Sequence, residues 1–140
     1  MTRNGLVVDS DGVKCWYRNG QRHRNGDEPT IINPNGTKFW YRDGQLHRDG
    51  DKPAAIHADG SKFWYRDGRV HRDGDEPAAM YANGAREWYW NGQHHRDGGK
   101  PAVIDSDGTK QYWTNGKRWK ELPNGMLGLG IMMIRKEEGK

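Results

Sequence analysis

The chain has 140 residues with a formal charge of +4, and 32% of its residues are apolar. This apolar share lies below the ~45–50% of ordinary globular domains, a benchmark that also counts glycine, and it excludes a layered sandwich with a large central core. Seven tryptophans and six tyrosines exclude a disordered chain, because disordered chains are poor in aromatic residues. The composition therefore predicts a thin sheet covered by aromatic side chains. A charge excess of this size permits nucleic-acid contact without requiring it.

Signals for the cellular compartment are few. The single cysteine, Cys15, excludes an intramolecular disulfide framework. No basic and apolar stretch followed by small residues opens the chain, so we expect no secretory signal. The longest apolar run, residues 131–134, is far shorter than the ~20 residues that span a bilayer. We therefore expect a soluble cytoplasmic protein with no membrane partner.

The chain opens with a partial unit, residues 1–12, in which residues 6–12 parallel residues 102–108. Units of one repeated phrase follow without a spacer over residues 13–119. The same turn glycine recurs every 24 residues, at Gly12, Gly36, Gly60, Gly84 and Gly108. A fixed period of this length is the sequence signature of a repeat array. The sequence therefore predicts a single repeat domain, residues 1–140, with no internal boundary.

Each unit carries two predicted strands between hairpin turns. Residues 62–66 read Lys-Phe-Trp-Tyr-Arg, and aromatic residues favour a pleated surface. Asp-Gly turns precede this strand at Gly60 and follow it at Gly68. A second strand begins after Pro77, because proline can start a strand but cannot lie inside a central one.

The predicted fold is all-β, with about five 24-residue β-hairpin units in an elongated, twisted antiparallel sheet. Near-identical units related by translation in such a sheet need an even number of strands, which favours two per unit. Ten strands at ~4.8 Å would extend ~50 Å. Three short strands per unit, with successive units flipped, is the alternative.

Alternation along the aromatic strand divides its side chains between two faces. Phe39 and Tyr41 share one face, and Lys38, Trp40 and Arg42 share the other. This second face recurs in three units and gives the candidate binding residues Lys38, Trp40, Arg42, Lys62, Trp64, Arg66, Arg86 and Trp88. An exposed ring between cations can stack on a base or sugar and neutralise a phosphate, or form a protein-binding hot spot. The alternative is packing, in which the tryptophans stack on neighbouring arginines to cover a sheet that has no second layer.

The C-terminal part, residues 120–140, departs from the repeat. The phrase ends after Trp119, and an apolar segment begins at Met126 and ends at Ile134. Repeat arrays need atypical ends, because an end unit would otherwise leave a strand edge or an apolar face open. We expect this segment to be a cap or to join two copies of the chain in a homodimer, and we expect residues 135–140 to be a tail.

Catalytic and metal-binding patterns are weak. His-Arg-Asp triplets, as at His47 and His71, are typical of kinase catalytic loops, but here they lack a glycine-rich phosphate loop and occur in several copies. The equivalent histidines of the units are His23, His47, His71 and His95. With two strands per unit they lie ~10 Å apart, too far to share a zinc ion whose ligand nitrogens stand ~2.1 Å away. We therefore expect no catalytic residue, no metal site, no cofactor and no enzyme.

The repeated phrase is similar to the MORN-type repeat, in the variant that carries Trp-Tyr-x-Asn-Gly-x-x-His-Arg-x-x-Gly-x-Pro-Ala. Residues 40–54 follow this motif with Asp43 in place of its asparagine and with Gly50 one position before its second glycine, and the resemblance covers residues 13–119. Trp119 and Lys120 depart from its His-Arg pair. The resemblance implies stacked β-hairpins in an elongated, twisted sheet. It also implies a setting in phage or large-virus genomes or in toxin–antitoxin systems.

These features favour a non-enzymatic protein-binding module with a protein partner of unspecified identity. The resemblance implies a phage- or virus-encoded modulator or inhibitor of a host protein, acting in the host cytoplasm. Nucleic-acid binding through the Lys-Trp-Arg stripe is one alternative, because exposed rings and cations suit single strands. Carbohydrate binding is another, since Trp-Tyr repeats also occur in cell-wall-binding modules of similar hairpin design.

Overall fold

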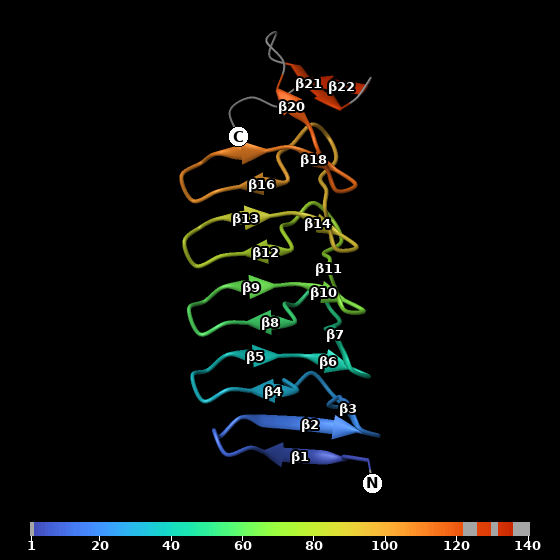
Figure 1. The fold of residues 1–140 in the computed structure, drawn as a ribbon, viewed down its shortest axis with the longest axis vertical. Coiled ribbons are helices and arrows are strands. Elements are labelled where there is room, and N and C mark those ends of the chain that lie inside the picture. The colour runs from blue at the N-terminus through green and yellow to red at the C-terminus, as the bar shows by residue number, and fades with distance from the viewer. Residues whose placement is uncertain (1, 122–125, 130–131, 136–140) are drawn as a thin grey trace.

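The computed structural model describes residues 2–121, 126–129 and 132–135, and it is an all-β array extended along one axis (Figure 1). Strands run across this axis and pair antiparallel in one long main sheet. In spatial order its strands are β1 (Gly5–Val8), β2 (Lys14–Arg18), β4 (Ile31–Ile32), β5 (Lys38–Phe39), β8 (Ala55–Ile56), β9 (Lys62–Phe63), β12 (Ala79–Met80), β13 (Arg86–Glu87), β16 (Val103–Ile104) and β17 (Lys110–Gln111). The short β3 (Gln21–Arg22) pairs with the outer half of β2. The predicted all-β array of hairpin units is confirmed.

A second row, of hairpins, lies beside the main sheet (Figure 1). The hairpins are β6 (Tyr41–Arg42) with β7 (Gln45–Leu46), β10 (Tyr65–Arg66) with β11 (Arg69–Val70), β14 (Tyr89–Trp90) with β15 (Gln93–His94), and β18 (Trp113–Thr114) with β19 (Lys117–Arg118). At the first turn Asp43 and Gly44 have φ angles of 47° and 86°, the left-handed values that a type I′ turn requires. The N–H of each turn glycine also donates to the preceding hairpin, as Gly68 does to the Leu46 carbonyl at 2.9 Å. The hairpins therefore stack along the array.

The Lys-Phe-Trp-Tyr-Arg stretch forms two short strands. The residues before the tryptophan pair within the main sheet, and the residues after it pair within the hairpin. Trp40 separates β5 from β6, and its N–H donates to the Ala54 carbonyl at 2.7 Å, beside the main-sheet strand β8. Its carbonyl accepts from the His47 N–H at 3.0 Å, beside the hairpin strand β7. The expectation of one continuous aromatic strand is therefore wrong. Each interior unit has four short strands, two in the main sheet and two in a hairpin, so the prediction of two strands per unit holds for the main sheet alone; successive units are not flipped.

The core of this thin array combines small and very large side chains. The alanines that follow Pro53, Pro77 and Pro101, namely Ala54, Ala78 and Ala102, are fully buried. The main bulk comes from tryptophans, since Trp64 and its equivalents in the neighbouring units are also buried. The core is thus a line of repeated packing sites along the array, each set by one unit of the sequence.

Beyond the repeats, a separate three-stranded sheet forms at the C-terminal end (Figure 1). Its strands are β20 (Lys120–Glu121), β21 (Met126–Leu129) and β22 (Met132–Arg135). The predicted apolar segment contributes the last two. Residues 122–125, 130–131 and 136–140 of the predicted cap and tail lie outside the described residues, and the homodimer expected through this segment stays a prediction.

Candidate binding surfaces

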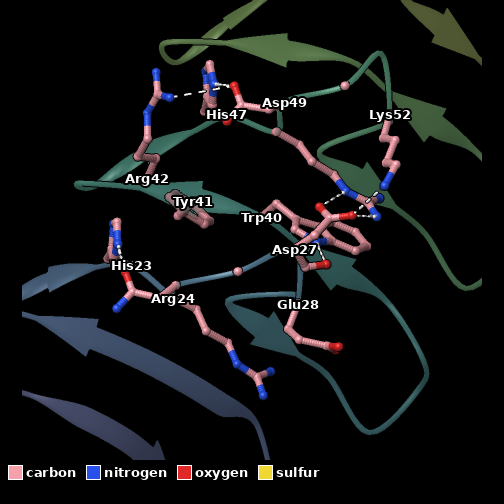
Figure 2. Close-up of a pocket in the computed structure, with 14 residues that line it drawn as sticks. His23, Arg24, Asp27, Glu28, Trp40, Tyr41, Arg42, His47, Asp49 and Lys52 are labelled. Carbon is pink, nitrogen blue, oxygen red and sulfur yellow. Dashed lines mark hydrogen bonds and ion pairs between the residues drawn. The ribbon is translucent and has the colours of Figure 1, made fainter.

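Two neighbouring units build a cradle around each interior tryptophan. The Arg48 guanidinium lies over the Trp40 ring, with its central carbon 3.9 Å from the ring centroid. Trp40 Nε1 donates to the backbone carbonyl of Asp27 at 3.2 Å (Figure 2). Arg48 Nε and Nη2 donate to the two carboxylate oxygens of Asp27 at 2.8 and 3.1 Å. The cradle thus fastens the ring of one unit to the loop of the unit before it.

The cradle recurs along the array. Its further copies are Trp64 with Arg72 and Asp51, and Trp88 with Arg96 and Asp75. In the first copy a second cation joins, because Lys52 Nζ lies 2.7 Å from the Asp27 carboxylate. Hydrogen bonds from Arg48 and Lys52 hold the pKa of the Asp27 carboxyl well below its usual range. The carboxylates of these loops are therefore engaged by cations of the same chain.

The cradles overturn the expectation that the stripe tryptophans are exposed. Trp40 and Trp64 are each 7% exposed, and Trp88 is 5% exposed. Because the chain bends at each tryptophan, the ring turns beneath an arginine of the next loop instead of lying between its flanking cations in solvent. The packing alternative is confirmed with one difference. The stacking arginine stands eight residues after the tryptophan, as Arg48 does after Trp40.

Open cavities lie between successive loops on the cradle side. Their volumes are about 480, 180 and 450 Å³ from the N-terminal end onward. Trp40, Arg42 and Lys52 are among the residues that line the first (Figure 2). Arg42 faces Asp49 at 3.6 Å, and Lys52 faces Asp27. The charges around this cavity therefore compensate one another.

Two cations of the predicted stripe join hairpins to one another. Arg42 donates to the Asp67 carboxylate at 3.1 Å, and Arg66 donates to the Asn91 side chain at 3.3 Å. Each acceptor lies in the turn of the following unit. These arginines therefore act in the stacking of the hairpin row.

The other stripe cations lie on an open face of the main sheet. Lys38, Lys62 and Arg86 are all exposed. With their equivalents in the first and last units they form what we name the cation row: Lys14, Lys38, Lys62, Arg86 and Lys110. Cross-strand pairing places one apolar residue between each two successive cations, in the order Ile32, Ile56, Met80 and Ile104, and Val8 lies beside Lys14 at the N-terminal end of the row.

The cation row has no ionic partner within the residues that the structure describes. None of its five members makes an ion pair there, whereas Arg42, Arg48 and Arg72 all do. Two strands per unit place successive cations ~10 Å apart, so the row extends over ~40 Å. The lysine methylenes and the aliphatic residues between the charges make this face both positive and partly apolar.

The opposite face of the main sheet carries a ladder of rings. Phe39, His57, Phe63 and Tyr81 meet edge to face in sequence, with centroid separations of 5.7, 5.3 and 5.3 Å. Edge-to-face contacts are a preferred geometry for aromatic pairs. This face is therefore half-covered by its own side chains, and its role is packing.

The ladder ends in a polar cluster around Glu87, which stands where earlier units have Phe. Glu87 Oε1 accepts from the Tyr89 hydroxyl at 2.7 Å and from His94 Nε2 at 2.8 Å. The His94 hydrogen bond lowers the pKa of Glu87, and burial raises the pKa of Tyr81 to about 12. Sequence reasoning missed this cluster. Its signal is that Glu87 and His94 replace, together, the Phe and aliphatic pair of the two preceding units.

The loop histidines bridge units by hydrogen bonds. His47 Nδ1 accepts from the Asp67 backbone N–H at 3.1 Å, and its Nε2 lies 2.8 Å from Asp49 Oδ1, to which it donates. His71 likewise accepts from the Asn91 N–H at 2.9 Å. The hydrogen bond from His47 keeps the pKa of the Asp49 carboxyl below its usual range. In the described part of the chain, no three His, Cys, Asp or Glu side chains converge as metal ligands would.

Comparison with models of known protein families gives no match for this chain, and comparison with curated proteins gives none either. The MORN-type resemblance therefore stays a prediction from the repeated phrase. None of the described residues belongs to a helix long and apolar enough to cross a membrane. What the chain offers a partner must accordingly be read from its surfaces, which are compensated cradles on one side and the uncompensated cation row on the main sheet.

Proposed function

We propose that the chain is a non-enzymatic protein-binding module whose cation row takes an acidic surface of a protein partner. The observation that carries this proposal is the difference in pairing between two sets of cations. The cradle and hairpin arginines meet carboxylates inside the protein, whereas Lys38, Lys62 and Arg86 meet none among the described residues. A row of like charges attracts a surface of opposite charge and guides its approach.

The alternation of cations with aliphatic side chains favours a protein partner over a nucleic acid. Stacking of bases needs exposed aromatic faces, and the stripe tryptophans are buried. Ile32 and Ile56 offer apolar area between the lysines, which a protein partner can cover with its own apolar side chains. The burial of the stripe tryptophans also removes the support for carbohydrate binding, which was based on exposed tryptophan rings. In the setting that the MORN-type resemblance implies, the partner would be a host protein that the module modulates.

A matched pair of charge reversals tests the proposal. One variant is Lys38→Glu/Lys62→Glu in the cation row. The control is Arg69→Glu/Lys117→Glu, which changes the charge equally at two exposed hairpin cations off the row. Each tagged protein is exposed to bacterial lysate with and without nuclease treatment, and recovered species are identified by mass spectrometry. A poly-glutamate peptide serves as competitor.

We expect one dominant protein to be recovered by the wild type and by the control, to be lost with the cation-row variant, and to be released by the peptide. Retention by the cation-row variant would contradict the proposal. Recovery that vanishes with nuclease, together with low-salt binding of labelled single-stranded DNA or RNA, would move the function to nucleic-acid binding, since such binding weakens steeply with salt.

A further inference from the structure

The strand β1 is an open edge of the main sheet (Figure 1). Within the described residues it pairs with β2 alone, whereas its equivalents β4, β8 and β12 each pair with an aromatic strand on both sides. Leu6 and Val8 of β1 are 49% and 53% exposed, more than any other exposed large apolar residue of the described chain. The edge is thus both unpaired and apolar.

The backbone of β1 points its free hydrogen-bonding groups outward at two residues. Leu6 lies opposite Trp16, whose N–H donates to the Thr30 carbonyl on the far side of β2 at 3.0 Å. Leu6 and Trp16 are therefore a non-hydrogen-bonded pair, and the Leu6 N–H and C=O face away from β2. Val8, two residues further along the strand, faces the same way.

The sequence of β1 leaves this edge unprotected. Proteins usually guard an edge strand with a charge, a proline or a bulge. The four residues Gly5–Val8 contain no charged residue and no proline. The strand can pair with a copy of itself, because an antiparallel pairing centred on Val7 sets Leu6 opposite Val8 and uses all the outward groups of both strands.

We propose that β1 pairs antiparallel with β1 of a second copy of this chain, about a two-fold axis normal to the main sheet. Such a contact is isologous and closes on itself, as in most homodimers. Leu6 and Val8 of both copies then form one apolar patch on the face that carries the cation row, because Val8 lies opposite Lys14. The two cation rows become collinear on a doubled sheet. This inference is independent of the proposed function.

The test is the association state of the full chain by sedimentation velocity over a range of concentrations. Val8→Lys adds a charge at the edge, and Met80→Lys makes the same change at the same repeat position inside the array, on a site that is also exposed (38% against 53%). Val8→Pro removes an outward N–H that β2 does not use, which an edge strand tolerates. Tryptophan fluorescence melting checks that each variant is folded.

We expect a wild-type dimer, a dissociation constant raised at least about tenfold in both Val8 variants, and no change in Met80→Lys. A wild type that stays monomeric to about 100 μM would overturn the proposal. A dimer that persists in Val8→Pro but is lost on deletion of residues 126–135 would overturn it too. Hydrogen exchange of the wild type gives a readout without substitution. The Leu6 and Val8 amides should become protected as concentration rises, and exchange that stays fast in a dimer contradicts the pairing.

Discussion

The interior units and the last unit each carry a hairpin, but they differ in the residues that connect one unit to the unit before it. An interior cradle is made of Trp, Arg and Asp, and at the three equivalent positions of the last unit stand Tyr112, Lys120 and Gly99. The three replacements occur together. Gly99 offers no carboxylate, and Lys120 offers no planar guanidinium for a two-pronged contact. The cradle is therefore a contact between interior units, and all three of its residue types are replaced in the last unit.

The histidine bridge changes at the same place. His71 bonds forward to the hairpin of the next unit, whereas Trp119, which occupies the histidine position of the last unit, is 4% exposed and donates to Thr114 Oγ1 of its own unit at 2.7 Å. At this position the interior units have a histidine that hydrogen-bonds to the following unit, whereas the last unit has a tryptophan that packs within its own unit. The departure from the interior contacts therefore includes Trp119.

The largest expected effect comes from emptying an interior cradle. Trp64→Ala should lower the free energy of unfolding by about 3–5 kcal/mol, as for large buried rings. Phe63→Ala should cost less, because Phe63 is only half-buried. Strict alternation of faces predicts the reverse order, so urea titrations of the two variants separate the two accounts. A larger loss in Phe63→Ala would contradict the cradle.

A smaller effect is expected from the forward bridge. His71→Ala removes the acceptor of the Asn91 N–H, and a lost hydrogen bond of this kind costs about 0.5–1.5 kcal/mol. The control is His57→Ala on the ring ladder, where no inter-unit hydrogen bond is lost. Denaturation that is no more perturbed in His71→Ala than in His57→Ala would show that the bridge contributes nothing.

A third pair of variants exchanges arginine and lysine at the cradle-cation position of an interior unit and of the last unit. Arg72→Lys should destabilise the chain by about 1 kcal/mol, because lysine cannot reproduce the stacked, two-pronged contact with Asp51. The reverse change, Lys120→Arg, should stay within about 0.5 kcal/mol, since Gly99 supplies no carboxylate. Equal thermal shifts in the two variants would mean that the arginine does not act through the cradle.

The smallest effect is a loss of stability in acid. Hydrogen bonds from the cradle arginines lower the pKa of Asp27 and of Asp75. Because the folded pKa lies below the unfolded value of about 3.9, the stabilisation is complete above that pH and is lost as the pH falls through the folded value. The melting temperature of the wild type should therefore fall more between pH 5 and 2 than that of Asp27→Asn/Asp75→Asn. Parallel pH profiles would contradict this.

The sequence was enough to predict the repeat array, its turns and the start of the strand that follows each unit's proline. The 24-residue glycine period and the proline before each second strand describe local backbone geometry, which turns and prolines control directly. The faces were harder to predict. Alternation holds through Lys38 and Phe39, but the change of partner at Trp40 depends on hydrogen bonds to Ala54 and His47, which no local pattern carries.

The sequence does contain a signal for the cradle, although the alternation of residues along strands does not reveal it. Arg48 and Asp27 are separated by 21 residues, nearly one repeat, and the last unit loses both equivalents at once, at Lys120 and Gly99. Correlated departures of this kind indicate contact between units. Three members of the cation row were among the predicted stripe residues: Lys38, Lys62 and Arg86. Only the tertiary structure shows that they differ from Arg42 and Arg66, which pair with side chains of the same protein.

The most direct test of this account is oxidation of tryptophan by N-bromosuccinimide, with each site followed by peptide mass spectrometry. Trp90 is 43% exposed, whereas Trp40 and Trp64 lie under arginines at 7%. The account predicts rapid oxidation of Trp90 while Trp40 and Trp64 stay protected in the folded protein and react only on unfolding. Oxidation of Trp40 and Trp64 as fast as that of Trp90 would show that the rings are exposed, and it would return the binding surface to the aromatic stripe.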